Sequence, residues 1–184
     1  MRALDYLGAL FAAVLAAAEA QSGGVLGALV AVQALLAGVL ILVHRKPQAE
    51  APLGVRLLAW GAVLLPLALR TDGRRPLWAV GVSAAGLLLA IWAMASLGAA
   101  FGVAPADRGL VVRGPYRWVR HPMYTGEMLT WLAVLGVSPT WSNLVIVAML
   151  GVVIGVRTRW EERLVAEYDR YRQSTPARFL PGVF

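Results

Sequence analysis

The chain has 184 residues, of which 59% are hydrophobic and 15% are charged, with a formal net charge of +7. Its mean hydropathy of +0.68 is far above that of a soluble domain of this length, and this excludes an ordinary soluble protein. The absence of cysteine and the presence of only two histidines exclude a disulfide framework, a thiol nucleophile and a histidine-built metal site. We therefore expect an integral membrane protein without a metal.

The positive charge favours membrane orientation over nucleic-acid binding. The isoelectric point is about 10.8, but the basic residues lie at the ends of apolar runs rather than along one soluble face. We therefore expect no nucleic-acid partner. Sixteen of the seventeen basic residues are arginine, and Ala, Gly and Val are abundant. This composition hints at a bacterial coding bias, and hence at a bacterial inner membrane.

Four apolar runs in the first half of the chain are each close to the length that crosses a bilayer. They are 4–20, 24–43, 53–69 and 77–97. The first run also resembles a signal peptide, because Arg2 precedes a short apolar stretch and alanines flank Glu19. Asp5 spoils the basic start of such a signal, so a transmembrane helix is favoured there.

The second half begins with a segment rich in Gly, Pro and Arg, 98–122, which cannot form one uninterrupted helix. We call it the connector and expect it at the membrane surface. Two shorter apolar runs, 123–137 and 144–156, flank a Pro turn and predict a helical hairpin. Its second arm is expected to continue without a break into a charged C-terminal helix.

The predicted fold is thus an all-α polytopic membrane bundle of about six transmembrane segments. We expect N-terminal transmembrane helices over 1–97 and a functional core of connector, hairpin and C-terminal helix over 98–184. With a cytoplasmic N-terminus, the connector and the tail both fall inside, as the positive-inside tendency expects. The exceptions are Arg70, Arg74 and Arg75, which this topology places outside; a re-entrant third segment would remove the conflict.

The densest polar and aromatic cluster, GPYRWVRHPMYTG, sits at the mouth of the hairpin. Pro122 fits the first turn of a helix, which places His121 at its N-cap. A helix N-terminus flanked by Arg117 and Arg120 attracts a carboxylate or a phosphate. The alternative is that these arginines and Trp118 only anchor the chain at the membrane interface.

Glu127 lies six residues beyond His121, which is about 9 Å along a helix axis and therefore below the interface. A carboxylate at that depth is costly and usually faces a polar cavity or a basic partner. We hypothesise that Glu127 faces a cavity for the reacting substrate, and could serve as a base there. The alternative is a snorkelling or salt-bridged side chain.

The C-terminal helix carries a second constellation. Arg157, Glu161, Leu164, Tyr168 and Tyr171 would form one narrow stripe on a continuous helix. Arg157 and Glu161 could be only an i,i+4 pair on a solvated surface. Because the stripe emerges on the same side as the connector, the two segments could line a common pocket. Its arginines, carboxylates and aromatic rings would suit a zwitterionic ligand with a positive centre, and S-adenosylmethionine is one of several such ligands.

Two segments resemble the signature of the isoprenylcysteine carboxyl methyltransferase and phospholipid methyltransferase superfamily of integral membrane enzymes. The pattern G-P-Y-R-x-x-R-H-P-x-Y-x-G is matched by Gly114, Pro115, Tyr116, Arg117, Arg120, His121, Pro122, Tyr124 and Gly126. A second element is matched by Arg157, Glu161, Glu162, Tyr168, Tyr171, Pro176 and Pro181. The stretch between Glu162 and Tyr168 is shorter than usual in that family.

This resemblance implies a methyltransferase that uses S-adenosylmethionine on the cytoplasmic side of the membrane. Its acceptor would be a lipophilic small molecule or a lipid that enters from the bilayer. The resemblance implies cofactor contacts from Arg117, His121, Pro122, Tyr124, Gly126, Glu162 and Tyr168. It points to Arg157 and Glu161 as catalytic residues that position the acceptor, to which the hypothesis above adds Glu127.

Two alternatives stay open at this level. Sterol and steroid reductases share the general membrane architecture and would use NADPH in a related pocket. A non-catalytic scaffold is the other alternative, since small residues spaced like Gly151 and Gly155 allow close helix packing between membrane segments.

Overall fold

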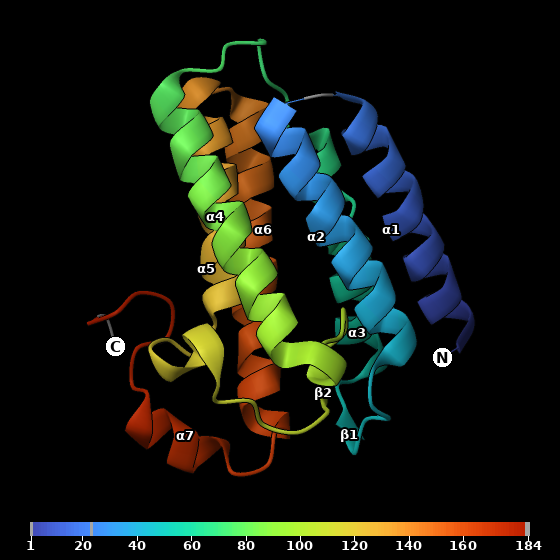
Figure 1. Cartoon of the computed structure of the whole chain (residues 1–184). Coiled ribbons are helices and arrows are strands. Elements are labelled where there is room, and N and C mark those ends of the chain that lie inside the picture. Colours follow the sequence, from blue (N-terminus) through green and yellow to red (C-terminus); the bar gives the residue numbers. More distant parts are fainter. Residues whose placement is uncertain (1, 23, 183–184) are drawn as a thin grey trace.

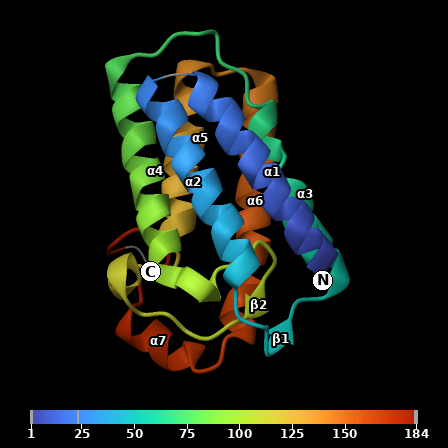
Figure 2. The same cartoon turned by 45° about the vertical axis from the view of Figure 1, so that its right-hand side comes forward.

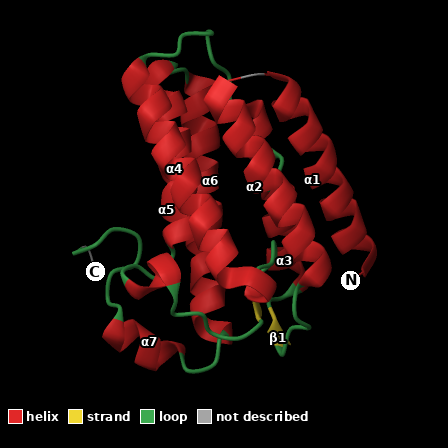
Figure 3. Ribbon diagram, viewed as in Figure 1, coloured by secondary structure: helices red, strands yellow, loops and turns green. Residues whose placement is uncertain are grey.

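The structure is a computed structural model that describes residues 2–22 and 24–182, and it confirms the all-α membrane bundle (Figures 1 and 3). Its elements are α1 (Arg2–Ser22), α2 (Gly24–Val43), β1 (Ala49–Glu50), α3 (Leu53–Ala62), η1 (Leu65–Ala68), α4 (Leu77–Leu97), η2 (Gly98–Ala100), β2 (Ala106–Asp107), η3 (Gly114–Arg117), α5 (Pro122–Val137), α6 (Trp141–Leu164) and α7 (Tyr168–Ser174).

Four of the helices are long and apolar enough to cross a membrane, by length and composition. Their spans are Leu4–Gln21, Gly24–Val43, Leu77–Ala100 and Trp141–Leu164. Large apolar side chains such as Leu10, Val25 and Val152 are exposed on the outer faces of these helices. Such apolar outer faces suit the hydrocarbon interior of a membrane.

The third and fifth apolar runs form shorter helices than the other four runs do. The third run is α3 followed by the 3-10 turn η1, which contains Pro66. It still passes from one end of the bundle to the other. Near its start the Ala51 N–H donates to the Pro105 carbonyl in the connector, and just after its end the Arg70 N–H donates to Asn143 in the first turn of α6. The fifth run is α5, 16 residues long, which lies alongside α4 (Figure 1).

Small residues set the closest helix contact, between α4 and α5. A Cβ atom added to Gly86 would collide with the Gly126 carbonyl, and one added to Gly126 would collide with the Gly86 carbonyl. Ala90, fully buried on α4, completes this contact. The two backbones can approach this closely only because no side chain stands between them. The contact fixes the helix on which His121 and Tyr124 stand.

All the polar segments that the sequence assigned to one side do gather at one end of the bundle. Figure 2 shows β1, β2, α7 and both chain ends there. The two short strands pair antiparallel, with Ala49 opposite Asp107, and so join the α2–α3 link to the connector. Arg70, Arg74 and Arg75 lie at the opposite end. Since the third run crosses the whole bundle, it is not re-entrant, and the exception to the charge rule persists.

The predicted continuous C-terminal helix is wrong beyond Leu164. Helix α6 ends there, Glu167 adopts a left-handed conformation with φ of 61°, and α7 starts as a separate helix. The break is supported from outside, because the Asp107 carboxylate accepts the Ala166 N–H at 3.3 Å. Tyr168 and Tyr171 therefore do not continue the stripe of Arg157 on α6. They reach the same pocket from α7 instead.

Candidate functional site

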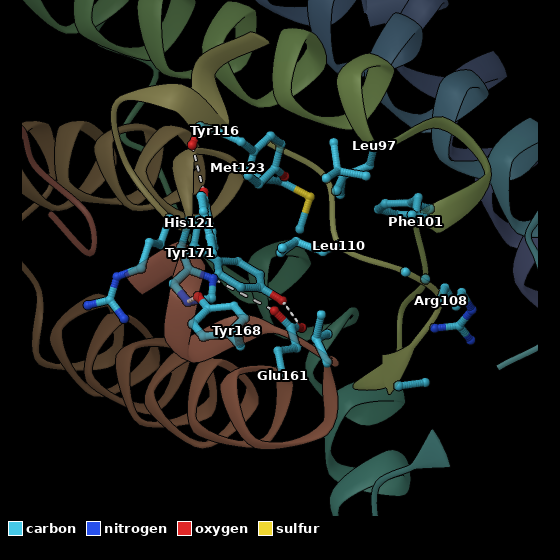
Figure 4. Close-up of a pocket in the computed structure, with 18 of the residues that line it drawn as sticks. Leu97, Phe101, Arg108, Leu110, Tyr116, His121, Met123, Glu161, Tyr168 and Tyr171 are labelled. Atoms are coloured by element: carbon cyan, nitrogen blue, oxygen red, sulfur yellow. Dashed lines mark hydrogen bonds and ion pairs between the residues drawn. The ribbon is translucent and has the colours of Figure 1, made fainter. Parts of the chain in front are cut away.

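A cavity opens at the polar end of the bundle, between the connector, the start of α5, the end of α6 and α7. Its empty space is ≈ 720 Å³, a volume that includes the solvent at its open mouth. Figure 4 shows His121, Glu161 and the tyrosines on one side of the cavity, and Leu97, Phe101, Leu110 and Arg108 on the other. Its polar lining is Arg108, Tyr116, Arg120, His121, Tyr124, Glu161, Tyr168 and Tyr171.

Glu162 is the centre of the charged network beneath this cavity. One of its oxygens, Oε1, lies 3.2 Å from Arg120 Nη1, 2.9 Å from His121 Nε2 and 2.9 Å from Arg178 Nε. The side chains of Arg120 and His121 are each 6% exposed. A carboxylate that holds three donors in a poorly solvated place fixes their positions firmly.

His121 links this network to the aromatic wall. Its Nε2 is also 3.1 Å from the Tyr168 hydroxyl. An ionised carboxylate can only accept hydrogen bonds, so Nε2 carries a proton that it donates to Glu162. The other ring nitrogen, Nδ1, lies 3.8 Å from Oε2 of Glu161. The imidazole is thereby held between the two adjacent carboxylates of α6.

A second chain of contacts runs from Glu161 down into the membrane. The Tyr124 hydroxyl donates to Glu161 Oε1 at 2.6 Å, and the guanidinium carbon of Arg157 lies 4.9 Å from the centre of the Tyr124 ring. Such stacking places a cation on an aromatic face. The Nε atom of Arg157 is buried and has no hydrogen-bond partner among the described residues.

The C-terminal segment packs against the residues that immediately precede α5 and against its first turn. The Arg120 N–H donates to the Ala177 carbonyl, and the His121 N–H donates to the Arg178 carbonyl, both at 3.0 Å. In addition, the Thr125 hydroxyl donates to the carbonyl of Phe179 at 2.7 Å. The C-terminal segment thus takes the N–H groups of the two residues before α5, whereas no hydrogen bond within the described residues uses the first-turn N–H groups of Met123 and Tyr124.

Burial keeps the tyrosine hydroxyls of the cavity in their neutral form. Desolvation raises the pKa of the Tyr116, Tyr168 and Tyr171 phenols above the ordinary value. The Tyr171 hydroxyl donates to the Tyr116 carbonyl at 2.6 Å. These groups therefore act as neutral hydroxyls that donate or accept hydrogen bonds, and as aromatic surfaces, rather than as bases.

The residues singled out from the sequence divide into three groups. His121, Tyr124, Glu161 and Tyr168 line the cavity. Glu162 positions the lining residues from below. The remaining residues lie outside the lining: Arg117, Pro122, Gly126, Glu127 and Arg157.

Those outside the lining have other contacts. Arg117 is exposed and lies against the exposed Trp118 ring, 5.3 Å from its centre, as an interfacial anchor would. Pro122 is the first residue of α5, as predicted, and Gly126 packs against α4. Glu127 lies deeper on α5, within electrostatic reach of Arg157.

Sequence reasoning missed the part played by the C-terminal segment. Arg178 donates to Glu162 and, through Nη2, to the fully buried Thr158 hydroxyl at 3.1 Å. Thr158 lies four residues before Glu162, on the same face of α6, and that spacing was visible in the sequence. No spacing rule, however, could place Arg178 beside them, because a loop and α7 intervene. Among the described residues, no group of three or more His, Cys, Asp and Glu could hold a metal ion.

Comparison with known proteins agrees with this geometry. The family model described as phospholipid methyltransferase matches residues 75–172, the part of the chain that supplies most of the cavity. The chain is also 31% identical over 100 residues to the uncharacterized protein YpbQ of Bacillus subtilis (strain 168). That match covers 50% of this chain and 59% of the relative, so it spans about three-fifths of the relative's length. The chain belongs to the phospholipid methyltransferase family of membrane methyltransferases.

Proposed function

We propose that the protein transfers a methyl group from S-adenosylmethionine to a lipophilic acceptor, at the polar end of the bundle. The observation that carries the proposal is the cavity wall formed by His121, Tyr124, Glu161 and Tyr168, held by Glu162. These residues come from both motifs that the family resemblance singled out. The cavity opens at the end of the apolar helices, where a water-soluble cofactor and a membrane-dissolved acceptor can both arrive.

The residues present suit the cofactor's chemistry. The cofactor carries a carboxylate, an ammonium, a sulfonium and an adenine ring. Arg120 lines the cavity with a buried Nε that has no partner among the described residues, and this spare donor suits a carboxylate. Glu161 suits an ammonium or a hydroxyl. The rings of Tyr116 and Tyr168 suit a positive centre or a flat heterocycle.

When bound, S-adenosylmethionine supplies a methyl group on a positively charged sulfur. The contribution of this chain is to bind, align and exclude water. The network around Glu162 keeps Arg120 and His121 in fixed positions. The covering C-terminal segment shields the same groups from solvent, and the apolar wall around Leu97 and Leu110 admits a hydrophobic partner.

Arg157 and Glu127 have a secondary place in this proposal. Both are partly buried and lie within electrostatic reach of each other, and neither forms a wall of the cavity. We propose that Arg157 positions Tyr124 and Glu161 for the acceptor. Glu127 would balance the charge of Arg157, and could remove a proton only if an acceptor penetrates below the cavity.

The test is calorimetric binding of S-adenosylhomocysteine to the protein in lipid nanodiscs, with NADPH titrated in parallel. We expect micromolar binding of S-adenosylhomocysteine and none of NADPH. His121→Ala should abolish this binding, because it removes the group that joins the two carboxylates to Tyr168. The matched control is Trp118→Ala, which changes an exposed side chain of the same connector.

Binding of NADPH alone would replace this proposal with a reductase. If neither compound binds to protein that unfolds cooperatively on heating, the enzyme proposal fails and a scaffold is left. One feature of the structure is compatible with a scaffold. A Cβ added at Gly151 or Gly155 would meet nothing within 4 Å, so that face of α6 is not used for packing within the described chain.

A further inference from the structure

A second cavity adjoins the first at the polar end of the bundle. The two share the connector residues Gly102, Ala104, Ala106 and Arg108 in their walls. Val103 and Pro105 of the connector also line the second cavity. The rest of its wall comes from α1, α2, α3 and the link between α2 and α3, which precede the stretch matched by the family model. Whatever it holds therefore contacts both the N-terminal half of the chain and the connector.

The lining of the second cavity is half apolar and half charged. Leu4, Ile41, Trp60 and Val103 are among its apolar lining residues. Its charged part is Asp5, His44, Glu50, Arg56 and Arg108. This combination suits the junction between the polar head and the hydrocarbon chain of an amphiphile.

The charges of this cavity are not all satisfied. Glu50 and Arg56 form a closed ion pair, with 2.6 Å between Oε2 and Nη1. Arg108, by contrast, has no carboxylate within ion-pair distance among the described residues, and its Nη1 only donates to the Ala104 carbonyl at 3.4 Å. Its Nε is buried without a partner. An arginine in this state has donors left for an anionic oxygen.

His44 points to the same chemistry. Its Nδ1 is also buried without a partner among the described residues, and its Nε2 is only loosely paired with Asp5, at 4.0 Å. Desolvation and the nearby charge of Arg108 lower the pKa of His44, with Asp5 and the backbone of Ile41 opposing. In a neutral imidazole, Nδ1 can either donate or accept one hydrogen bond, depending on which ring nitrogen carries the proton.

We propose that the second cavity binds the acidic oxygen of a membrane amphiphile, with Arg108 and His44 as its recognition residues. Figure 4 places Arg108 on the connector, on the far side of the first cavity from Tyr168. If the proposed function holds, this amphiphile is the methyl acceptor, and the shared wall brings its head beside the cofactor cavity. An ionised oxygen would gain the methyl carbon as the methyl–sulfur bond breaks with its electron pair going to sulfur, so no proton has to be removed.

The experiment uses a photoactivatable C16 carboxylic acid as the probe, with the amine of the same chain length for comparison. Both are presented to the protein in nanodiscs of neutral lipid, under conditions that ionise the acid. We expect the acid to label peptides that contain Trp60 or Val103, and to bind at least about tenfold more tightly than the amine. Arg108→Gln should weaken binding of the acid by about tenfold or more.

The matched control is Arg113→Gln. Arg113 is an exposed arginine of the same connector that lines neither cavity and donates to the Ser96 carbonyl, and its loss should change acid binding less than about twofold. Equal binding of acid and amine, or labelling elsewhere on the chain, would overturn the proposal. So would an Arg108→Gln variant that loses S-adenosylhomocysteine as severely as the acid, since Arg108 would then serve the first cavity.

Failure of the proposed function has a different signature. In that case the acid labels the second cavity of the wild-type protein, while S-adenosylhomocysteine does not bind at all. The second site would stand as a binding site for an acidic amphiphile, and its link to methyl transfer would be overturned. The labelling of wild-type protein needs no variant, so it remains informative even if Arg108→Gln fails to fold.

Discussion

The two ends of the bundle handle buried polar groups in opposite ways. At the end opposite the cavities, the fully buried Asn143 side chain accepts the Arg70 N–H at 3.0 Å and donates to the Arg70 and Ser138 carbonyls, each at 2.8 Å. Its amide thus ties the end of the third run to the hairpin turn. This end is a closed structural connection in which both N–H donors of the Asn143 amide are used.

The cavity end keeps such capacity. Four buried side-chain nitrogens lack a hydrogen-bond partner among the described residues, and all four lie at this end: His44 Nδ1, Arg108 Nε, Arg120 Nε and Arg157 Nε. A buried donor without a partner costs stability. The hydrogen bonds at the far end therefore hold the helices together. At the cavity end, by contrast, donors remain available for ligands that bind and dissociate.

Glu162→Gln should give the largest effect, because it leaves Arg120, His121 and Arg178 around a neutral amide. Breaking a buried charge network in this way costs about 3–5 kcal/mol. We expect S-adenosylhomocysteine binding to weaken by about 100-fold or more, together with a lower unfolding temperature. Calorimetry and thermal unfolding measure the two effects. Glu167→Gln is the control, since its ion pair with Arg170 is exposed; equal losses in both variants would contradict the role given to Glu162.

Asn143→Leu should separate stability from binding. It removes three buried hydrogen bonds at the far end, and we expect a loss of about 3 kcal/mol in the free energy of unfolding. Binding of S-adenosylhomocysteine should stay within about twofold in protein that is still folded. Ser142→Ala, next to it and exposed, is the control. A large loss of binding at a temperature where the variant is folded would show that the two ends are coupled.

Gly126→Ala tests whether this motif glycine serves packing or the cofactor. An added methyl group collides with the Gly86 carbonyl, and overpacking of this kind costs about 1–3 kcal/mol. Gly151→Ala is an apt control, because the same change in α6 meets open space. We expect a lower unfolding temperature for Gly126→Ala only. An unchanged unfolding temperature combined with weaker S-adenosylhomocysteine binding would assign Gly126 to the cofactor instead.

Arg117→Gln should give the smallest effect. Arg117 is exposed on Trp118 and lines no cavity, so S-adenosylhomocysteine binding should change less than about twofold. Arg120→Gln, three residues further on, should weaken binding by about tenfold or more, because Arg120 lines the cavity. Calorimetry on the two variants compares them directly. Equal losses would restore the expectation, drawn from the motif, that Arg117 holds the cofactor.

The sequence was sufficient to predict the parts of the fold that depend on apolar length. It placed six runs and the first turn of α5 at Pro122, since a helix that crosses lipid must be long, apolar and internally hydrogen-bonded. It could not predict that α6 stops after Leu164, because the carboxylate that supports the break belongs to Asp107 in the connector. Contacts between residues that are far apart in the sequence produce no periodic pattern from which they could be predicted.

The candidate site was predictable to a similar extent. The motif pointed to His121 and Tyr124, and both line the cavity. The same motif equally pointed to Arg117, which faces outward, because a motif records residue types rather than the direction of a side chain. Arg178 was missed, since its role depends on a C-terminal segment that folds back over α5.

Hydrogen exchange, followed by mass spectrometry with and without S-adenosylhomocysteine, tests the contrast between the two ends most directly. We predict slower exchange in the connector, 98–122, and in the stretch 157–182 when the ligand is present. Exchange in the far-end segments 69–76 and 138–143 should not change. Protection of the far end alone, or no change at the cavity end with the ligand demonstrably bound, would contradict the assignment of the cofactor to this cavity.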